Sequence, residues 1–240
     1  MLIDLGSHLF RSNISRPLSD CKIPFVIFIY LILFLAGNIS AQKNPCGKID
    51  TLHYGGKIYH TVRIGNQCWL KENLDIGIMI PGTQNQTDNE IIEKYCYAND
   101  PKNCEKYGGL YQGNEAMQYR PVEKTRGICP SGWHIPSKKE FEILYSNVDK
   151  NGNALKEVNE GVGNGAGTNA SGFSALLAGY RYVDGAFYDL GYSTDFWNST
   201  EHTGTMARNL YLSRYDGYFV ITSYNYGKEY GFTVRCIKDQ

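Results

Sequence analysis

Residues Ile128–Leu144, with the sequence ICPSGWHIPSKKEFEIL, place a cysteine, a tryptophan and a helix start within a short distance of one another. Ser137 and Glu140 form the pattern of a capping box, in which each side chain accepts a hydrogen bond from the other residue's backbone amide. The stretch therefore predicts a turn or strand at Cys129–Trp133 that leads into one well-defined helix, with Asn151-Gly152 as its stop. The apolar residues that share one face of this helix are Phe141, Leu144, Tyr145 and Val148.

An apolar run near the N-terminus indicates export. Lys22 precedes the run Phe25–Ala36, and small residues follow at Ser40-Ala41, which is the pattern of a secretory signal peptide. We therefore predict a signal peptide at residues 1–41, with a long n-region that a different start codon would explain, and a secreted or cell-surface protein. The run is shorter than the roughly 20 residues of a membrane span. The alternative is an uncleaved anchor, and only then would the protein contact a membrane.

The cysteines that follow the predicted signal are Cys46, Cys68, Cys96, Cys104, Cys129 and Cys236. An even number of cysteines in an exported chain indicates disulfide bonds. No two of them have CxxC spacing, which argues against a zinc site. Counting alone leaves the pairing open. We expect Cys129–Cys236 and Cys96–Cys104, the latter closing a turn at Asp100-Pro101, and Cys46–Cys68 by elimination.

Composition favours short strands rather than long helices. Lys and Arg together number 24, and Asp and Glu together also number 24, mixed along the chain, so a dedicated nucleic-acid surface is not expected. Tyrosine and glycine are abundant, and candidate strands recur roughly every ten residues. We predict an α+β protein with short antiparallel strands and long loops around one or two helices, stapled by disulfides. An N-terminal lead at 42–57 would precede a single domain at 58–240.

Alternating and apolar segments locate the expected strands. In the first, Ile58–Ile64, we expect His60 to lie on the apolar face as a packing residue. Gly161–Gly172 is rich in glycine and asparagine and lacks a GK[ST] ending, so it predicts a flexible loop and not a phosphate cradle. The other expected strands lie at 67–70, 173–182, 186–188, 195–200, 207–213, 219–221 and 231–238, with a helical candidate at 114–119.

Six segments, taken together and in this order, resemble the Fibrobacter succinogenes major paralogous domain. The resemblance covers about 58–239 and implies an exported bacterial protein of unsettled activity, typical of Bacteroidetes and Fibrobacter relatives. It also implies a fold similar to C-type lectins and formylglycine-generating enzymes, and it supplies no agreed catalytic residues, so we predict none. The segments are Tyr59–Gly65 with Gln67, Trp69, Glu72, Asn73 and Leu74; Tyr107–Tyr111; Cys129–Ser137; Gly172–Arg181; Phe196–Thr200; and Gly231–Cys236.

The sequence can be compared with two kinds of site known in proteins of similar fold, a reactive cysteine and a calcium site. Formylglycine-generating enzymes use reactive cysteines, and Arg235 and Lys238 flank Cys236, but an oxidising compartment and a partner at Cys129 favour a disulfide. Calcium-binding C-type lectins carry Trp-Asn-Asp, whereas Ser199 follows Trp197-Asn198 here. A calcium ion needs six to eight oxygen ligands, and no such carboxylate cluster is recognisable. We therefore predict neither a metal site nor a cofactor.

Tyrosines are dense in the last third of the chain, and this density indicates a recognition surface. The alternative is that about half of them face the core with their hydroxyls satisfied. The Asp-Gly pair in Arg214–Tyr218 predicts a turn whose tyrosines are exposed. The residues that we predict to bind a ligand are Tyr188, Tyr192, Trp197, Tyr215, Asp216, Tyr218, Tyr224 and Tyr226.

Three functions from different classes remain open at this stage. The first is an exported binding module that recognises a glycan or a protein without calcium. The second is an oxidase similar to formylglycine-generating enzymes, which requires that Cys236 or another cysteine is free. The third is a purely structural component of the envelope or of an adhesion assembly.

Overall fold

The computed structural model describes residues 44–120, 122–203, 205–221 and 226–240. The predicted signal peptide lies outside the described residues. Lys43–Gln240 form one compact unit, so the segment expected as a lead at 42–57 belongs to it almost entirely. Strand β1 (Thr51–Tyr54) lies in this segment and pairs with β2 (Lys57–Ile64). Among the described residues, no helix has the length and apolar character to cross a bilayer.

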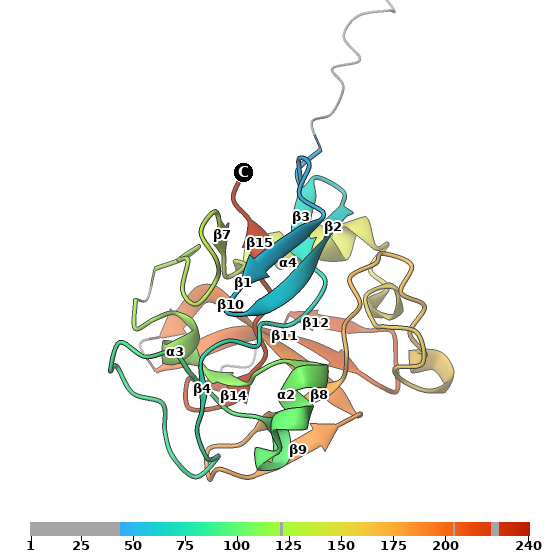
Figure 1. The fold of residues 1–240 in the computed structure, drawn as a ribbon. Helices are drawn as coiled ribbons and strands as arrows, with labels where there is room; N and C mark the ends of the chain where they lie inside the picture. Colours follow the sequence, from blue (N-terminus) through green and yellow to red (C-terminus); the bar gives the residue numbers. More distant parts are fainter. Residues whose placement is uncertain (1–43, 121, 204, 222–225) are drawn as a thin grey trace, which may run out of the picture. The chain divides into compact units, whose positions relative to one another are not determined.

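Two sheets form the framework of the unit (Figure 1). The five-stranded sheet has the order β1-β2-β3-β15-β7 and lies at the end of the unit that holds the C-terminus. The eight-stranded sheet follows the order β12-β11-β10-β8-β14-β6, with β13 on β11 and β9 on β8. The strands of these sheets not yet given are β3 (Gln67–Leu70), β6 (Tyr111–Gln112), β7 (Trp133–His134), β8 (Ala178–Arg181), β9 (Phe187–Leu190), β10 (Ser193–Thr203), β11 (Met206–Ser213), β12 (Phe219–Ile221), β13 (Tyr226–Gly227), β14 (Gly231–Phe232) and β15 (Ile237–Lys238).

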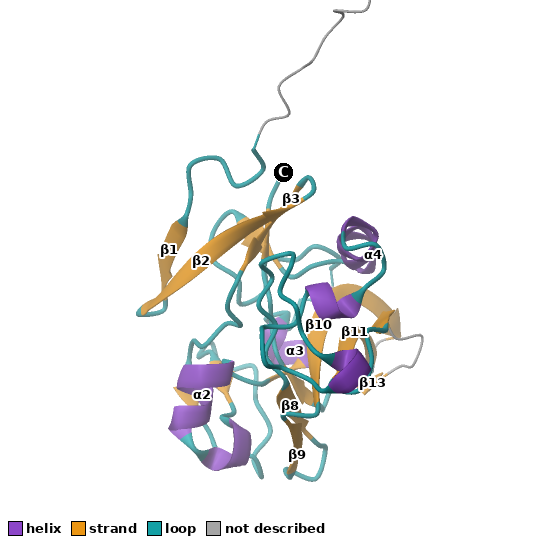
Figure 2. Cartoon of the chain, turned by 90° about the vertical axis from the view of Figure 1, so that its right-hand side faces the viewer, coloured by secondary structure: helices purple, strands orange, loops and turns teal. Residues whose placement is uncertain are grey.

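Helices are few and short (Figure 2). The α-helices are α2 (Pro101–Tyr107), α3 (Gly113–Ala116) and α4 (Lys138–Asn147), and the 3-10 helices are η1 (Tyr97–Asn99), η2 (Gly152–Ala154) and η3 (Gly163–Gly165). A two-stranded sheet joins β4 (Ile78–Met79) to β5 (Glu93–Lys94). The predicted α+β class, with short strands and disulfides, is confirmed at this level. The expectation of antiparallel strands is wrong for two pairs, because β8 runs parallel to β10 and β4 runs parallel to β5.

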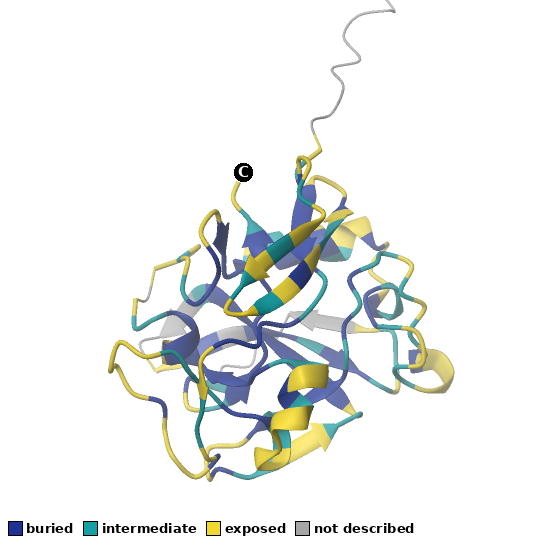
Figure 3. Ribbon diagram, viewed as in Figure 1, coloured by how far each residue is buried: buried dark blue, intermediate teal, exposed yellow. Residues whose placement is uncertain are grey.

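Strand β10 separates two apolar clusters. Successive side chains of a strand point to opposite faces, so Phe196 and Trp197 lie in different clusters although they are neighbours in sequence. Phe196 packs against Phe173 and shares its cluster with Trp69 of β3 and Phe141 of α4. Trp197 packs with Phe232 and with the cysteines of two disulfides on the other face. Figure 3 shows these central strands as the most buried part of the unit.

The predicted helix after Pro136 is confirmed as α4. Ser137 accepts from the Glu140 amide and Glu140 accepts from the Ser137 amide, so the capping box is complete. Phe141, Leu144 and Val148 are buried, as their spacing predicts. The helix ends at Asn147, before the predicted stop at Asn151-Gly152, because Asp149 and Lys150 adopt positive φ angles of 50° and 59° that a helix does not accommodate.

The predicted orientation of the first strand is wrong. The error is confined to the start of β2, where Tyr59 is buried, whereas Ile58 and His60 are exposed, and His60 pairs with Glu72 at 2.7 Å instead of packing in the core. At the end of the strand the prediction is confirmed, because Ile64 is buried and Val62 packs against the same apolar cluster. The prediction assigns the apolar residues of the strand to its buried face. Tyrosine can also bury its ring, however, when its hydroxyl has a hydrogen-bond partner. The Tyr59 hydroxyl accepts from the Asp75 amide at 3.0 Å, which makes that burial possible.

All three predicted disulfides are confirmed: Cys46–Cys68, Cys96–Cys104 and Cys129–Cys236. The turn predicted between Cys96 and Cys104 is instead a 3-10 turn that leads into helix α2, with Cys104 inside the helix. Asp100 caps this helix by accepting from Lys102, and Pro101 occupies its first position, where a missing amide hydrogen costs nothing. Cys129–Cys236 links two segments 107 positions apart in the sequence and lies in the apolar cluster beneath Trp197.

Candidate functional site

Five tyrosines form one continuous aromatic surface, which we call the tyrosine platform. Its members are Tyr180, Tyr182, Tyr188, Tyr226 and Tyr230. Ring centroids lie 5.2 Å apart for Tyr182–Tyr230 and for Tyr226–Tyr230, and 5.9 Å apart for Tyr180–Tyr188. Tyr188 is 44% exposed and Tyr182 is 36% exposed, while the other members are half-buried. The platform therefore presents aromatic rings to solvent over a supported base.

Strand geometry places these rings on one side of the sheet. Tyr180 and Tyr182 are two residues apart on β8 and its continuation, so they share a face, and Tyr188 on β9 lies directly opposite Tyr180 in the register. Phe232 of β14 lies among them, with its ring 5.4 Å from Tyr226 and 4.5 Å from the buried Trp197. A fully buried tryptophan and phenylalanine thus support the platform from the core side.

The hydroxyls of Tyr180 and Tyr230 are neutral at ordinary pH. Burial raises the pKa of Tyr180 to about 12. Burial, followed by the hydrogen bond with Tyr182, also raises the pKa of Tyr230 to about 12. Each neutral phenol has one O–H to donate and two lone pairs that accept. The surface therefore combines flat apolar rings with hydroxyl groups that can both donate and accept, and it carries no charge of its own.

A second aromatic group lies where β11 ends, and we call it the Arg214 cluster. The guanidinium carbon of Arg214 lies 4.3 Å from the ring centre of Tyr192 and 5.4 Å from that of Tyr215. Tyr192 is 48% exposed and Tyr215 is 60% exposed, with their ring centroids 6.2 Å apart. The Arg214 amide donates to the Tyr192 carbonyl at 2.8 Å, which joins the two turns.

The predicted binding residues divide between these groups. Tyr188 and Tyr226 belong to the platform, and Tyr192 and Tyr215 to the Arg214 cluster. Tyr218 is 73% exposed in the turn after Tyr215, and Asp216 accepts there from the Tyr218 amide at 3.0 Å. Tyr224 lies outside the described residues. The inclusion of Trp197 was wrong: its side chain is fully buried, and its Nε1 donates to the Tyr111 carbonyl at 2.7 Å.

Four members of these groups were not predicted: Tyr180, Tyr182, Tyr230 and Arg214. Tyr180 and Tyr182 carry a usable signal, because two tyrosines at a spacing of two share one face of a strand. Tyr230 and Arg214 carry none. Their positions depend on a contact between β14 and β8 and on a backbone hydrogen bond to Tyr192, neither of which local sequence indicates.

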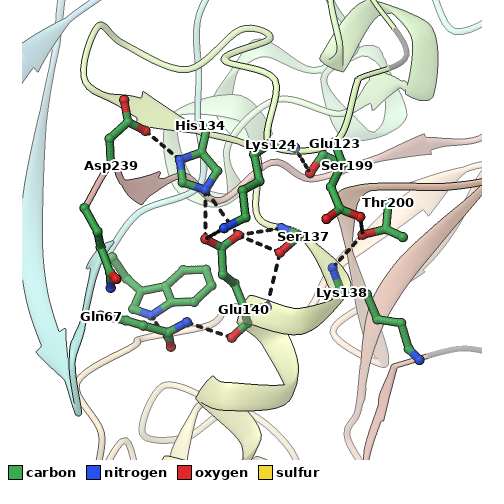
Figure 4. A network of polar contacts seen from close by, with 12 residues as sticks. Gln67, Glu123, Lys124, His134, Ser137, Lys138, Glu140, Ser199, Thr200 and Asp239 are labelled. Atoms are coloured by element: carbon green, nitrogen blue, oxygen red, sulfur yellow. Dashed lines mark hydrogen bonds and ion pairs between the residues drawn. The ribbon is translucent and has the colours of Figure 1, made fainter.

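A buried polar network joins the start of α4 to the C-terminus (Figure 4). His134 contacts Asp239 through Nδ1 at 2.6 Å and Glu140 through Nε2 at 3.1 Å. Burial by itself would lower the pKa of His134, but its bonds to Glu140 and Asp239 outweigh burial and raise it. Likewise, burial opposes the bonds that Glu140 accepts from His134 and Ser137, and those bonds lower the pKa of Glu140 to about 2. The ion pair therefore holds the chain end against the helix.

A cleft of about 340 Å³ lies between β2 and α2. Its walls carry charges of both signs, among which Lys57 pairs with Asp75 at 2.8 Å. Arg235 in its wall is fully buried and donates to the Asn73 side chain and to the carbonyls of Leu70 and Phe173. These hydrogen bonds give Arg235 a structural role.

The cysteines offer no thiol among the described residues, since each of them forms a disulfide. Cys236 itself is fully buried and bonded to Cys129. In the described part of the chain, no group of three or more histidine, cysteine, aspartate or glutamate side chains is arranged to hold a metal ion.

The structure thus defines a disulfide-bonded α+β domain with aromatic surfaces on one sheet and without an evident catalytic centre among the described residues. The model of the Fibrobacter succinogenes major domain family matches residues 62–238, and the chain belongs to this family. Comparisons with curated proteins and with solved structures returned no match. The three disulfides are typical of extracellular proteins.

Proposed function

We propose that this protein is an exported binding module that recognises a glycan, without calcium, through the tyrosine platform. The observation that carries the proposal is the platform itself, in which Tyr182 and Tyr188 stand exposed above the half-buried rings of Tyr180, Tyr226 and Tyr230. A C-type-lectin-like scaffold, a cleaved signal peptide and a location outside the cell are parts of the same proposal.

The chemistry of the platform suits a sugar. A pyranose ring has an apolar face of C–H groups and an edge of hydroxyls, and tyrosine offers a large rigid ring with one polar tip. The neutral hydroxyls of the platform can exchange hydrogen bonds with sugar hydroxyls in either direction. Because the rings are already packed against one another, few side-chain rotamers have to be immobilised on binding.

Of the alternatives, the oxidase and the purely structural component receive less support from the described residues. An oxidase of the formylglycine-generating type needs a free thiol, and the cysteines of the described residues are all bonded. A protein ligand would bind the same aromatic surface, because tyrosine is also enriched in protein interfaces, and a parallel protein array distinguishes it from a glycan. A purely structural component would not need exposed tyrosines packed ring to ring.

A glycan array probed with the secreted protein tests the proposal. The glycan found is then titrated against Tyr182→Ala and Tyr188→Ala, and each is expected to weaken binding about tenfold or more, because each removes an exposed ring. Ile143→Ala is the control: this side chain is 38% exposed on α4 and belongs to neither aromatic group, so its loss should leave affinity unchanged. Tyr218→Ala tests the turn at Arg214 separately.

The outcome is decided by three results. Retention of glycan affinity in both platform variants would remove the platform from the site. The absence of any glycan bound by the parent protein, with binding only on a parallel protein array, would contradict the proposed function. Loss of binding in Tyr218→Ala but not in the platform variants would move the site to the neighbouring turn.

A further inference from the structure

We infer that the Arg214 cluster is an anion-binding subsite that takes the carboxylate or sulfate group of an acidic sugar. This inference rests on the proposed function, since it names the class of glycan. It starts from the surroundings of Arg214, which differ from those of the other arginines that pack on aromatic rings.

Arg214 lacks polar partners. Among the described residues, its guanidinium makes no hydrogen bond or ion pair, and its Nε is buried without an acceptor. Arg181 also packs on a tyrosine ring, yet its guanidinium donates to the carbonyls of Gly82 and Glu229 at 2.8 and 2.9 Å. A buried donor without an acceptor costs free energy. The terminal nitrogens of Arg214 are neither hydrogen-bonded nor buried among the described residues, so they, and not Nε, are the donors that a ligand can reach.

The rings of Tyr192 and Tyr215 hold the guanidinium in place by cation–π contact. An arginine fixed in this way loses little side-chain entropy when it binds, and its planar fork matches the two oxygens of a carboxylate or two oxygens of a sulfate. A sugar that bears the anion would lie beside the exposed rings of Tyr192 and Tyr215. Arg214 can therefore bind the anion of an acidic sugar while the flanking tyrosine rings contact its sugar ring.

The turn that carries Arg214 is supported from beneath. Lys156 is fully buried, and its Nζ donates to the Ser213 carbonyl at 2.5 Å and to the Asp216 carbonyl at 2.8 Å, on either side of Arg214 and Tyr215. Gly165 packs so closely that a Cβ atom there would lie 2.2 Å from the Arg214 carbonyl oxygen. The backbone of the turn is thereby fixed before any ligand arrives, which is the condition for a preorganised site.

Local charge favours an anion. Lys156 places a second positive charge beneath the turn; its hydrogen-bond partners are carbonyl oxygens, and the Asp216 carboxylate interacts with it electrostatically, so Arg214 and Lys156 together outweigh the one negative charge of the turn. The aspartates of the two neighbouring turns have other contacts: Asp216 accepts from the Tyr218 amide at 3.0 Å and Asp189 from the Ser193 hydroxyl at 3.4 Å. Neither aspartate forms an ion pair with Arg214.

The test uses three simple sugars: methyl glucuronoside with a carboxylate, glucose 6-sulfate with a sulfate, and methyl glucoside as the neutral match. NMR of arginine Nε–H groups reports directly on Arg214, whose signal is assigned by its loss in Arg214→Lys. At least one anionic sugar at millimolar concentration is expected to shift that signal, and the neutral sugar is not. Comparison of the two anionic sugars identifies which anion is preferred.

Affinities of the array-selected acidic glycan then separate the alternatives. Arg214→Gln is expected to weaken the affinity for this glycan about tenfold or more. Arg214→Lys is expected to weaken it less, because lysine keeps the positive charge but not the planar fork of donors. Arg63→Gln, at an exposed arginine on β2, is the control and should have no effect. An unshifted Arg214 signal with every sugar, or parent-like affinity in Arg214→Gln, overturns the inference. If Tyr188→Ala still abolishes binding in that case, the proposed function stands; if neither variant matters, both fail.

Discussion

Replacement of Glu140 by glutamine tests the buried network that joins α4 to the C-terminus. The Glu140 carboxylate contacts His134 Nε2 at 3.1 Å and accepts from the Ser137 amide at 2.8 Å. Glutamine keeps the shape and one acceptor oxygen but removes the negative charge. A lowering of the pKa of Glu140 from 4.5 to about 2 corresponds to about 3 kcal/mol of stability, and the side chain is only 12% exposed, so solvent screening is limited.

The sign of the pH dependence follows from the direction of the shift. Because the pKa of Glu140 is lower in the folded state than in the unfolded state, its stabilisation is present above about pH 4.5 and is lost as the pH falls toward about 2. We therefore expect Glu140→Gln to unfold more easily than the parent by about 2–3 kcal/mol near neutral pH. That difference should shrink steadily in acid.

Urea denaturation at several pH values, with the disulfides intact, measures this difference. Glu142→Gln on the same helix is the matched control: Glu142 pairs with Lys138 at 3.1 Å, but both side chains are largely exposed, so a loss below about 0.5 kcal/mol is expected. Equal stability of Glu140→Gln and the parent near neutral pH would refute the reasoning. So would a difference that stays constant down to the acid limit, since a pH-independent loss would come from packing and not from charge.

Three further outcomes are expected. Ser137→Ala removes one half of the capping box and should cost about 0.5–2 kcal/mol in urea denaturation; an unchanged midpoint would mean that the cap contributes nothing. Intact mass after alkylation without reductant should show no modified cysteine in the secreted protein; two or more adducts would contradict the pairing of all six cysteines that follow the predicted signal. Burial raises the pKa of Asp195 from 3.8 to about 8, so the stability that its neutral form contributes is present in acid and is lost between about pH 4 and about pH 8. Asp195→Asn should therefore match the parent in acid, exceed it increasingly up to about pH 8 and keep that advantage at higher pH, as thermal unfolding at several pH values would show; equal stability near pH 8 would contradict the raised pKa.

The sequence was most informative where a structure is local. The capping box of α4 lies within four positions, and the helix start followed directly from it. Alternation and turn residues located β8 with β9 and β10 with β11, because hairpins are also local. The same reasoning failed for the first half of β2, where a hydrogen bond from the Asp75 amide to the buried Tyr59 hydroxyl accompanies the inward turn of Tyr59. Such a partner cannot be read from the strand's own residues.

The binding surfaces could be predicted only in part, for the same reason. Abundant tyrosine indicated a recognition surface in the last third of the chain, and it correctly marked Tyr188, Tyr192, Tyr215 and Tyr218 as exposed. It also selected Trp197, because the sequence does not show that its indole nitrogen meets the Tyr111 carbonyl. Grouping the tyrosines required the sheet order, in which β14 lies beside β8 and brings Tyr230 to Tyr182.

Three arginines that stack on aromatic rings differ in their hydrogen-bond partners. Arg181, Arg214 and Arg235 all lie in the second half of the chain beside tyrosine or cysteine, and all three stack on aromatic rings. Arg181 and Arg235 are fully buried and donate to carbonyl and amide oxygens, which offsets the cost of burying their charge. Arg214 has the same aromatic support but no oxygen partner among the described residues. Two arginines therefore show how this fold satisfies a guanidinium when its role is structural, and the third departs from that pattern at an exposed turn, where a ligand can reach it.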